Sequence, residues 1–254
     1  MASPSTAIGF SVSVRLEWLE QAAALVSLGR SAREVRASLH EIIGEERLAD
    51  PSKRADSRTR TVSVISALWV EPPEHLGGLR DRAVALLPTI PTAQHVAVHW
   101  GMSMAAYPFF ACVAENTGRL LRLQGVAGGG DVFRRVAEQY GERPTTKRAT
   151  SLTLQTIMQW GVLAAANEER LIEARQFRAV APVKVGARPA AWLLEAQIRA
   201  SGRNSASLRD LATSPAVFPF VFSDDVEAAV DASDVLVKLS LGVSDTTVAL
   251  RHRD

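Results

Sequence analysis

The sequence predicts a mostly α fold: a helical N-terminal bundle, then a winged helix-turn-helix, then a second small unit of helices and a hairpin. Three observations predict it. Apolar residues recur at three- and four-residue spacing through most of the chain. Glycine and proline end these stretches, and alternating segments follow the helices of the middle and last thirds. We place the units at 1–103, 104–181 and 182–254.

Composition limits the class of protein. The chain has 254 residues, of which 47% are hydrophobic and 22% charged, as in globular proteins. The formal net charge is only +2, so no overall positive field points to a polyanion. The single cysteine, Cys112, excludes an internal disulfide and lies in an apolar run, where we expect a buried side chain.

The N-terminal third predicts four helices. An apolar stripe covers residues 14–28 and ends at Gly29. Ser31 is the expected N-cap of the second helix, because Glu34 stands at the capping-box position three residues later. The third helix is expected at 57–70, before two prolines, and the fourth at 75–87.

Residues 95–114 form the longest nearly uncharged run, and about twenty residues suffice to span a bilayer. The run contains His99, Gly101 and Pro108. We therefore expect a buried central helix that breaks near Pro108, not a membrane span. The N-terminal segment lacks the basic start and apolar core of a secretory signal, so we expect a cytoplasmic protein.

The middle third predicts a winged helix. A helix from 109 ends at Gly125, and a short helix capped by Asp131 ends at Gly141. After a tight turn, Thr145 or Thr146 is the expected cap of a third helix. Strand patterns at 161–163 and from residue 171 flank a polar turn and predict a hairpin. Helix, short helix, turn, helix and hairpin is the order of a winged helix-turn-helix.

Basic residues gather in this unit. Residues 119–148 hold seven basic residues against three acidic ones, which indicates phosphate contact. The candidate DNA-binding residues are Arg134, Arg135, Arg143, Thr145, Thr146, Lys147, Arg148, Ser151 and Gln155. The alternative is a protein-docking module, since small basic patches are common on solvated faces. A second basic stretch covers 47–60.

We find no sign of catalysis, cofactor or metal in the pattern. The three glycines at 128–130 lack the spacing of a phosphate-binding loop and indicate a flexible connection. His95 and His99 have the spacing of a metal pair on a helix, but no third ligand stands out, and we expect two partly buried residues. The sequence therefore predicts no enzyme.

The last third predicts a second unit of similar type. A helix begins at Pro189 and ends at Gly202, and a short helix begins at Ser205 or Ser207. Another short helix is expected at 224–230, and residues 234–251 alternate as a hairpin around 242–245. Few basic residues lie here, so we expect a scaffold or docking surface.

Several segments resemble a known family. The runs AAYPFFACVAENTGRLLRLQG, YGERPTTKRA and QWGVL, and the later LLEAQIRASGR and LRDLATSPAVFPF, are similar to BrxA-type proteins of BREX phage-defence systems. The resemblance covers about 104–220. It implies winged-helix elements, binding of double-stranded DNA, no enzymatic activity, and partners among other phage-defence proteins. The family has more arginines in the third helix, where this chain has Ser151, Thr153, Gln155 and Thr156.

Overall fold

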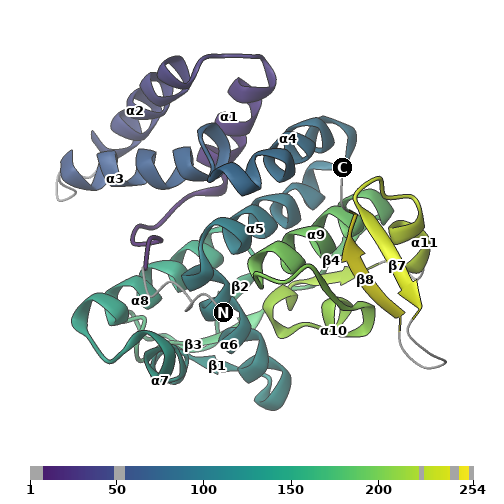
Figure 1. The fold of residues 1–254 in the computed structure, drawn as a ribbon. Helices are drawn as coiled ribbons and strands as arrows, with labels where there is room; N and C mark the ends of the chain where they lie inside the picture. The colour runs from purple at the N-terminus through teal and green to yellow at the C-terminus, as the bar shows by residue number, and fades with distance from the viewer. Residues whose placement is uncertain (1–7, 49–54, 223–225, 241–245, 252–254) are drawn as a thin grey trace.

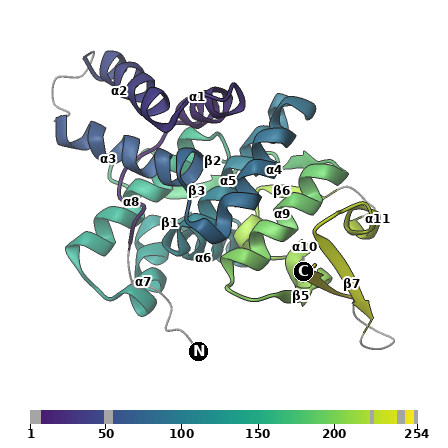
Figure 2. The same cartoon turned by 45° about the horizontal axis from the view of Figure 1, so that its top comes forward.

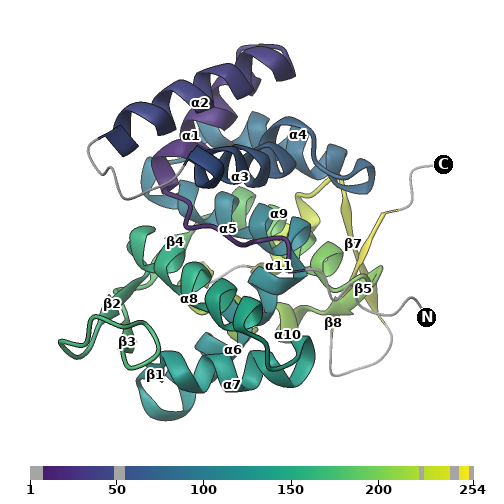
Figure 3. The same cartoon turned by 90° about the vertical axis from the view of Figure 1, so that its left-hand side faces the viewer.

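The computed structural model describes residues 8–48, 55–222, 226–240 and 246–251. Most of them are helical, as the periodicity predicts. In Figure 1 the first three helices lie at the top, α4, α5 and α9 run through the middle, and α6 to α8 lie below them. The C-terminal strands stand at the opposite side from α8, as Figure 2 also shows, and Figure 3 views the molecule from the side of α8 and the β2–β3 hairpin.

The N-terminal helices follow the predicted stripes and caps. Their bounds are α1 (Leu16–Ser27), α2 (Ala32–Leu48), α3 (Ala55–Ile65) and α4 (Gly77–Leu86), and a π-helical turn, Ser66–Val70, extends α3. The capping box is confirmed: the amide of Glu34 donates to Ser31 Oγ at 3.3 Å, and the amide of Ser31 donates to Glu34 Oε2 at 2.8 Å. Two otherwise unpaired N–H groups at this helix start are thereby satisfied.

The nearly uncharged run forms the centre of the molecule. Helices α5 (His95–Ala106) and α6 (Pro108–Gln124) meet at Tyr107, and every residue of α5 from Val96 to Ala105 is buried. The chain bends there by 119°, because Pro108 begins a new helix. Within the described ranges no single helix is long and apolar enough to cross a bilayer; the bent pair 92–106 and 108–124 passes by length and composition only.

The middle unit joins three helices to a small antiparallel sheet. After α6 come β1 (Ala127–Gly128), α7 (Gly129–Tyr140), α8 (Pro144–Gln159), β2 (Leu163–Ala165) and β3 (Gln176–Ala179). Strand β3 lies between the other two. Its fully buried Phe177 stands opposite Ala127 of β1 and Ala165 of β2. The predicted hairpin is therefore present, and a strand that precedes α7 completes its sheet.

The C-terminal unit repeats this order with shorter helices. Its elements are α9 (Ala187–Ala200), β5 (Ser205–Ser207), α10 (Leu208–Ala212), α11 (Val226–Asp231), β7 (Leu236–Ser240) and β8 (Thr246–Leu250). Strand β8 lies between β5 and β7, antiparallel to both. A parallel pair, β4 (Val183–Val185) with β6 (Phe220–Phe222), links the unit to the chain before it. The expected helix start at Asp224 and the turn at 242–245 lie outside the described residues.

The starts of α7 and α8 differ from the expectation. Helix α8 begins at Pro144 after Arg143, and no side chain caps it. The prediction that Thr145 or Thr146 is the cap was wrong, because proline at the first helical position already fixes the helical φ. Helix α7 begins at Gly129, so Asp131 lies in its first turn and is not its N-cap.

The three glycines at 128–130 are not a flexible connection, and that prediction was wrong. Gly128 belongs to β1 and the other two begin α7. A Cβ at Gly129 would lie 1.9 Å from the carbonyl oxygen of Ile172. The amide of Gly129 donates to the Arg175 carbonyl at 2.9 Å, and that of Gly130 to the Glu173 carbonyl at 2.9 Å. Glycine is needed here because the backbone of the hairpin loop lies against the helix start.

The second strand of the hairpin begins later than predicted. Residues 171–174 form a turn, and β3 begins only at Gln176. The side chain of Arg175 holds this turn, donating from Nε to the Glu169 carbonyl at 2.6 Å and from Nη2 to the Arg170 carbonyl at 3.1 Å. Asn167 adds a bond from Nδ2 to the Ala174 carbonyl at 3.1 Å. The loop between β2 and β3 is thus closed by its own side chains.

One continuous apolar core runs through all of these elements. It extends from Phe10 and Leu19 through Trp100 to Val248. The division predicted after residue 103 falls inside α5, whose buried residues belong to this core.

Candidate nucleic-acid interface

Helix α8 is held by an unusual buried face that is rich in threonine. Thr146, Thr150, Thr153 and Thr156 are all buried. The hydroxyls of Thr150, Thr153 and Thr156 each donate to the carbonyl four residues earlier, at 2.9 Å. Bonding to their own helix lets polar side chains enter the core without leaving a donor unpaired. The opposite face of α8 is therefore free to face outward.

The N-terminal segment fixes the far end of α8. The amide of Val14 donates to Thr156 Oγ1 at 3.1 Å, and Trp160 Nε1 donates to the Val14 carbonyl at 2.9 Å. Ser13 Oγ donates to Gln159 Oε1 at 2.7 Å. These contacts hold the C-terminal end of the helix against the N-terminal segment.

The structure brings most of the predicted residues to one region, with different exposure. Six are exposed: Arg134, Arg143, Thr145, Lys147, Arg148 and Gln155. Arg135 and Ser151 are half-buried. Thr146 is fully buried, and its hydroxyl has no hydrogen-bond partner among the described residues. Its nomination as a DNA contact was wrong, because position 146 lies on the core side of the helix.

Two of these residues already have acidic neighbours. Arg134 Nη2 lies 2.8 Å from Asp131 Oδ1, in an exposed pair three residues apart. Ser151 Oγ contacts Glu173 Oε1 at 3.4 Å and donates to the Lys147 carbonyl at 3.1 Å. The loop between β2 and β3 therefore places a carboxylate beside α8, about two turns beyond its start.

The start of α8 is the most positive part of the site. Arg143, Lys147 and Arg148 are exposed and form no ion pair with any residue that the structure describes. They surround an uncapped helix N-terminus, where N–H groups and the helix dipole favour an anion. Three cations and a helix start form a geometry suited to phosphate oxygens.

Sequence reasoning missed Arg178 on β3. The strand alternates, with Gln176 and Arg178 exposed on either side of buried Phe177. That alternation is the signal that would have placed Arg178 on the outer face of the hairpin. In the second basic stretch, Lys53 and Arg54 lie outside the described residues.

The histidine pair and the cysteine take structural positions. His99 is fully buried, more than expected, and Nε2 of His99 and Nδ1 of His95 lie 3.1 and 3.0 Å from Glu20 Oε1. The described residues contain no group of three or more side chains that suits a metal ion. Cys112 is buried, as expected, and burial raises its pKa to about 11, so its thiol is protonated near neutral pH.

Comparisons with family models, curated proteins and solved structures found no match to this chain. The candidate interface consists of a helix start with exposed cations and of a hairpin whose strand β3 carries the exposed Arg178 and whose loop places Glu173 beside the helix.

Proposed function

We propose that this protein binds duplex DNA through a winged helix made of α6, β1, α7, α8 and the β2–β3 hairpin. The order of these elements and the position of β3 between β1 and β2 support this interpretation. Helix α8 is the recognition helix and the hairpin is the wing. The first turn of α8 approaches the major groove, and the wing lies along the backbone.

The observation that carries the proposal is the group of cations at the start of α8. Arg143, Lys147 and Arg148 are exposed, and no ion pair within the described residues neutralises them. Each phosphate they neutralise releases counterions, which favours binding at low salt, so log Kd should rise with log salt by about 0.9 per contact. Most of the binding free energy then comes from the backbone and depends little on sequence.

Readout of bases is weak in this proposal. Gln155 is the exposed side chain of α8 best suited to a base edge, and it lies beyond Ser151, whose hydroxyl contacts Glu173. The Glu173 carboxylate beside the groove repels phosphates, and its contact with Ser151 occupies a hydroxyl that could otherwise donate to a base. We therefore propose a sequence-tolerant binder, not a site-specific repressor.

The biological role that we propose is that of a non-enzymatic accessory protein in a BREX-like phage-defence system. It rests on the resemblance of residues 104–220 to BrxA-type proteins. A methyltransferase and a large ATPase encoded beside this gene would support the role, and a neighbourhood without defence genes would contradict it.

Lys147→Ala with Arg148→Ala tests the DNA interface. We expect weaker binding to a duplex and a salt slope that is smaller by about 1.8, because two phosphate contacts are lost. Fluorescence anisotropy at several salt concentrations measures both. The matched control is Arg33→Ala with Arg209→Ala, two exposed arginines of α2 and α10, which should leave the slope unchanged.

A docking module is the competing function, because helix-turn-helix units also serve as protein-docking units and small basic patches are common on solvated faces. Absence of binding to any duplex at low salt would support docking and reject the DNA proposal. If the Lys147→Ala, Arg148→Ala variant and the unchanged protein bind duplex DNA with equal affinity, the assignment of α8 as the recognition helix is rejected.

A further inference from the structure

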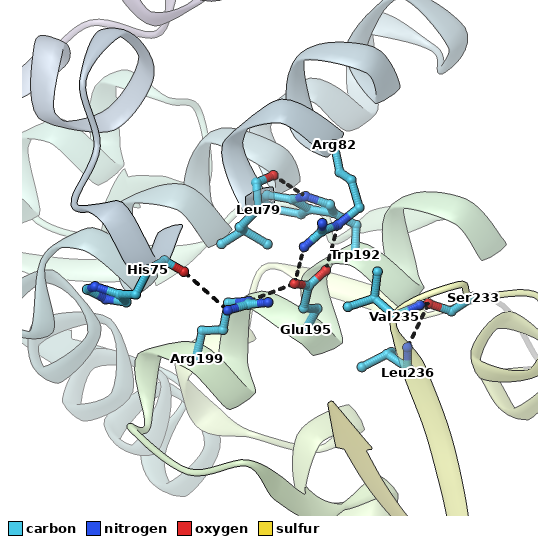
Figure 4. A network of polar contacts seen from close by, with 9 residues as sticks. All are labelled: His75, Leu79, Arg82, Trp192, Glu195, Arg199, Ser233, Val235 and Leu236. Atoms are coloured by element: carbon cyan, nitrogen blue, oxygen red, sulfur yellow. Dashed lines mark hydrogen bonds and ion pairs between the residues drawn. The ribbon is translucent and has the colours of Figure 1, made fainter. Parts of the chain in front are cut away.

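A buried carboxylate on α9 fixes two arginines far from the DNA interface. Glu195 has a side chain that is only 3% exposed. Arg82 of α4 donates from Nε to Glu195 Oε2 at 3.1 Å and also pairs with Oε1 through Nη2. Arg199, one turn later on α9, donates from Nε to Oε1 at 2.6 Å and from Nη1 to the His75 carbonyl at 3.2 Å (Figure 4). One carboxylate thus holds two guanidinium groups in place.

A third arginine completes a small polar cavity. Arg251, which follows β8, donates from Nη2 to the Leu236 carbonyl at 3.2 Å. The cavity, about 230 Å³, is lined by Arg82, Arg199, Asp234, Val235 and Arg251. Three guanidinium groups against the carboxylates of Glu195 and Asp234 leave an excess of one positive charge. Each guanidinium has further N–H groups that donate to no described residue. The three arginines are therefore held in position and can still donate hydrogen bonds to a ligand.

An apolar cavity adjoins the polar one. It measures about 270 Å³ and shares Arg82, Asp234 and Val235 with its neighbour. Leu86, Ala191, Trp192 and Ala229 supply much of its wall. The indole of Trp192 is fixed, because its Nε1 donates to the Leu79 carbonyl at 3.1 Å (Figure 4). A rigid aromatic wall beside a cluster of arginines suits a ligand with a flat apolar body and an anionic end.

We propose that these joined cavities bind a small nucleotide, with its phosphate on Arg82, Arg199 and Arg251 and its base in the apolar cavity beside Trp192. Guanidinium groups match phosphate oxygens in pairs. Neither cavity alone reaches the about 300 Å³ at which ligand pockets begin, whereas the two joined exceed it.

A free nucleotide fits this place better than a DNA backbone. The side chains of Arg82 and Arg199 are only 35% and 23% exposed, so they lie below the surface that a duplex would touch. The site is also at the opposite side of the molecule from α8 (Figures 1 and 2). Nucleotide binding here is therefore independent of the DNA interface.

Titration of the full chain with adenosine 5′-monophosphate, followed by isothermal calorimetry, tests the proposal. We expect one bound nucleotide per chain. Arg251→Ala should weaken binding about tenfold, the effect of losing one charge-assisted hydrogen bond. The matched control is Arg209→Ala, an exposed arginine of α10 that lines neither cavity, and it should bind as the unchanged protein does.

Glu195→Gln gives a change of opposite sign. It keeps an oxygen that accepts from an arginine but removes a negative charge from the cavity, so nucleotide affinity should rise. A purely structural role for Glu195 would not increase affinity. If this variant does not fold, Arg251→Ala still decides, because that residue is exposed and, among the described residues, its side chain bonds a single carbonyl.

Several results would overturn the proposal. No heat and no thermal shift with millimolar nucleotide would reject the site, and so would equal affinity of Arg251→Ala and the unchanged protein. Inorganic phosphate that binds as tightly as the nucleotide would reject the role of the apolar cavity. Displacement of the nucleotide by duplex DNA would reject the independence of the two sites.

Discussion

At the scale of single residues, burial and charge act against each other at His99. The imidazole is fully buried on α5 in an edge contact with Trp69, with ring centroids 5.0 Å apart and an interplanar angle of 73°. Its Nε2 lies at ion-pair distance from Glu20 but without hydrogen-bond geometry. Burial lowers the pKa of His99 and outweighs the Glu20 charge. For Glu20 the balance is the reverse. Burial raises its pKa, but the contacts with His99 and His95 together have the larger effect, so the pKa of Glu20 is lowered.

These two shifts predict a loss of stability in acid. The unfolded imidazole binds its proton near pH 6.5, above the pKa of the folded one, so the free energy of unfolding falls as the pH drops through this value. One such proton changes it by at most about 1.4 kcal/mol per pH unit. The lowered pKa of Glu20 removes further stability below pH 4.5. Urea unfolding between pH 8 and 4 measures the decline.

Two histidine variants separate His99 from the other titrating groups. His99→Gln should flatten the dependence between pH 7 and pH 5, whatever its effect on absolute stability. The control is His75→Gln, since the His75 side chain is exposed and only its carbonyl bonds Arg199. A slope that persists in His99→Gln would show that another group titrates.

At the scale of elements, backbone contact between α7 and the β2–β3 loop sets the geometry of the middle unit. Gly129 and Gly130 allow this contact because they have no Cβ, and their amides donate to the carbonyls of Arg175 and Glu173. The same loop positions Glu173 against Ser151 of α8. The start of α7 therefore determines where the β2–β3 hairpin lies relative to α8.

Gly129→Ala should damage this junction. The new Cβ would overlap the Ile172 carbonyl, and relief of such crowding costs about 1–3 kcal/mol of folding free energy. Duplex affinity should fall as well, because the wing moves. Denaturant unfolding and anisotropy measure the two effects. Gly77→Ala is the control: nothing lies within 4 Å of a Cβ there, and the residue is helical, so stability should be unchanged or slightly raised.

At the scale of the whole molecule, Trp100 joins the middle and C-terminal units. Its fully buried ring makes edge contacts, with centroids 5.2–6.1 Å apart, to Phe110, Trp160, Phe218 and Phe220. Its Nε1 donates to the Ala216 carbonyl at 2.9 Å. Gly118 of α6 packs against Pro215 so closely that a Cβ at position 118 would lie 2.0 Å from the Pro215 carbonyl oxygen. The two units therefore share one interior.

A shared interior predicts cooperative unfolding of the whole chain. Far-UV circular dichroism and tryptophan fluorescence should give coincident denaturant transitions. Trp100→Ala should lower the free energy of unfolding by about 3–5 kcal/mol, whereas Leu123→Ala, at a side chain 75% exposed, should change it by less than about 0.5 kcal/mol. Two separated transitions in the unchanged protein would contradict this expectation.

Local patterns were enough to find most helices and the order of the middle unit. The capping box of Ser31 and Glu34, and the glycines that end α6 and α7, act within a few residues, so the sequence displays them directly. Strand β5 was missed, because Ser205–Ser207 becomes a strand only by pairing with β8 more than forty residues later. The residues nominated as DNA contacts stay a prediction; the structure shows that Thr146 is buried and that Arg178, which was not nominated, is exposed beside them.

By itself the sequence determined which stretches form most of the helices and which stretch carries the positive charge, because helical periodicity and charge are properties of neighbouring residues. Only the tertiary structure decided that Thr146 faces the core, that Glu173 lies beside Ser151, and that Arg82 and Arg199 meet on Glu195. Arg82 and Glu195 are 113 positions apart, and no local pattern records which distant side chains a folded core brings into contact.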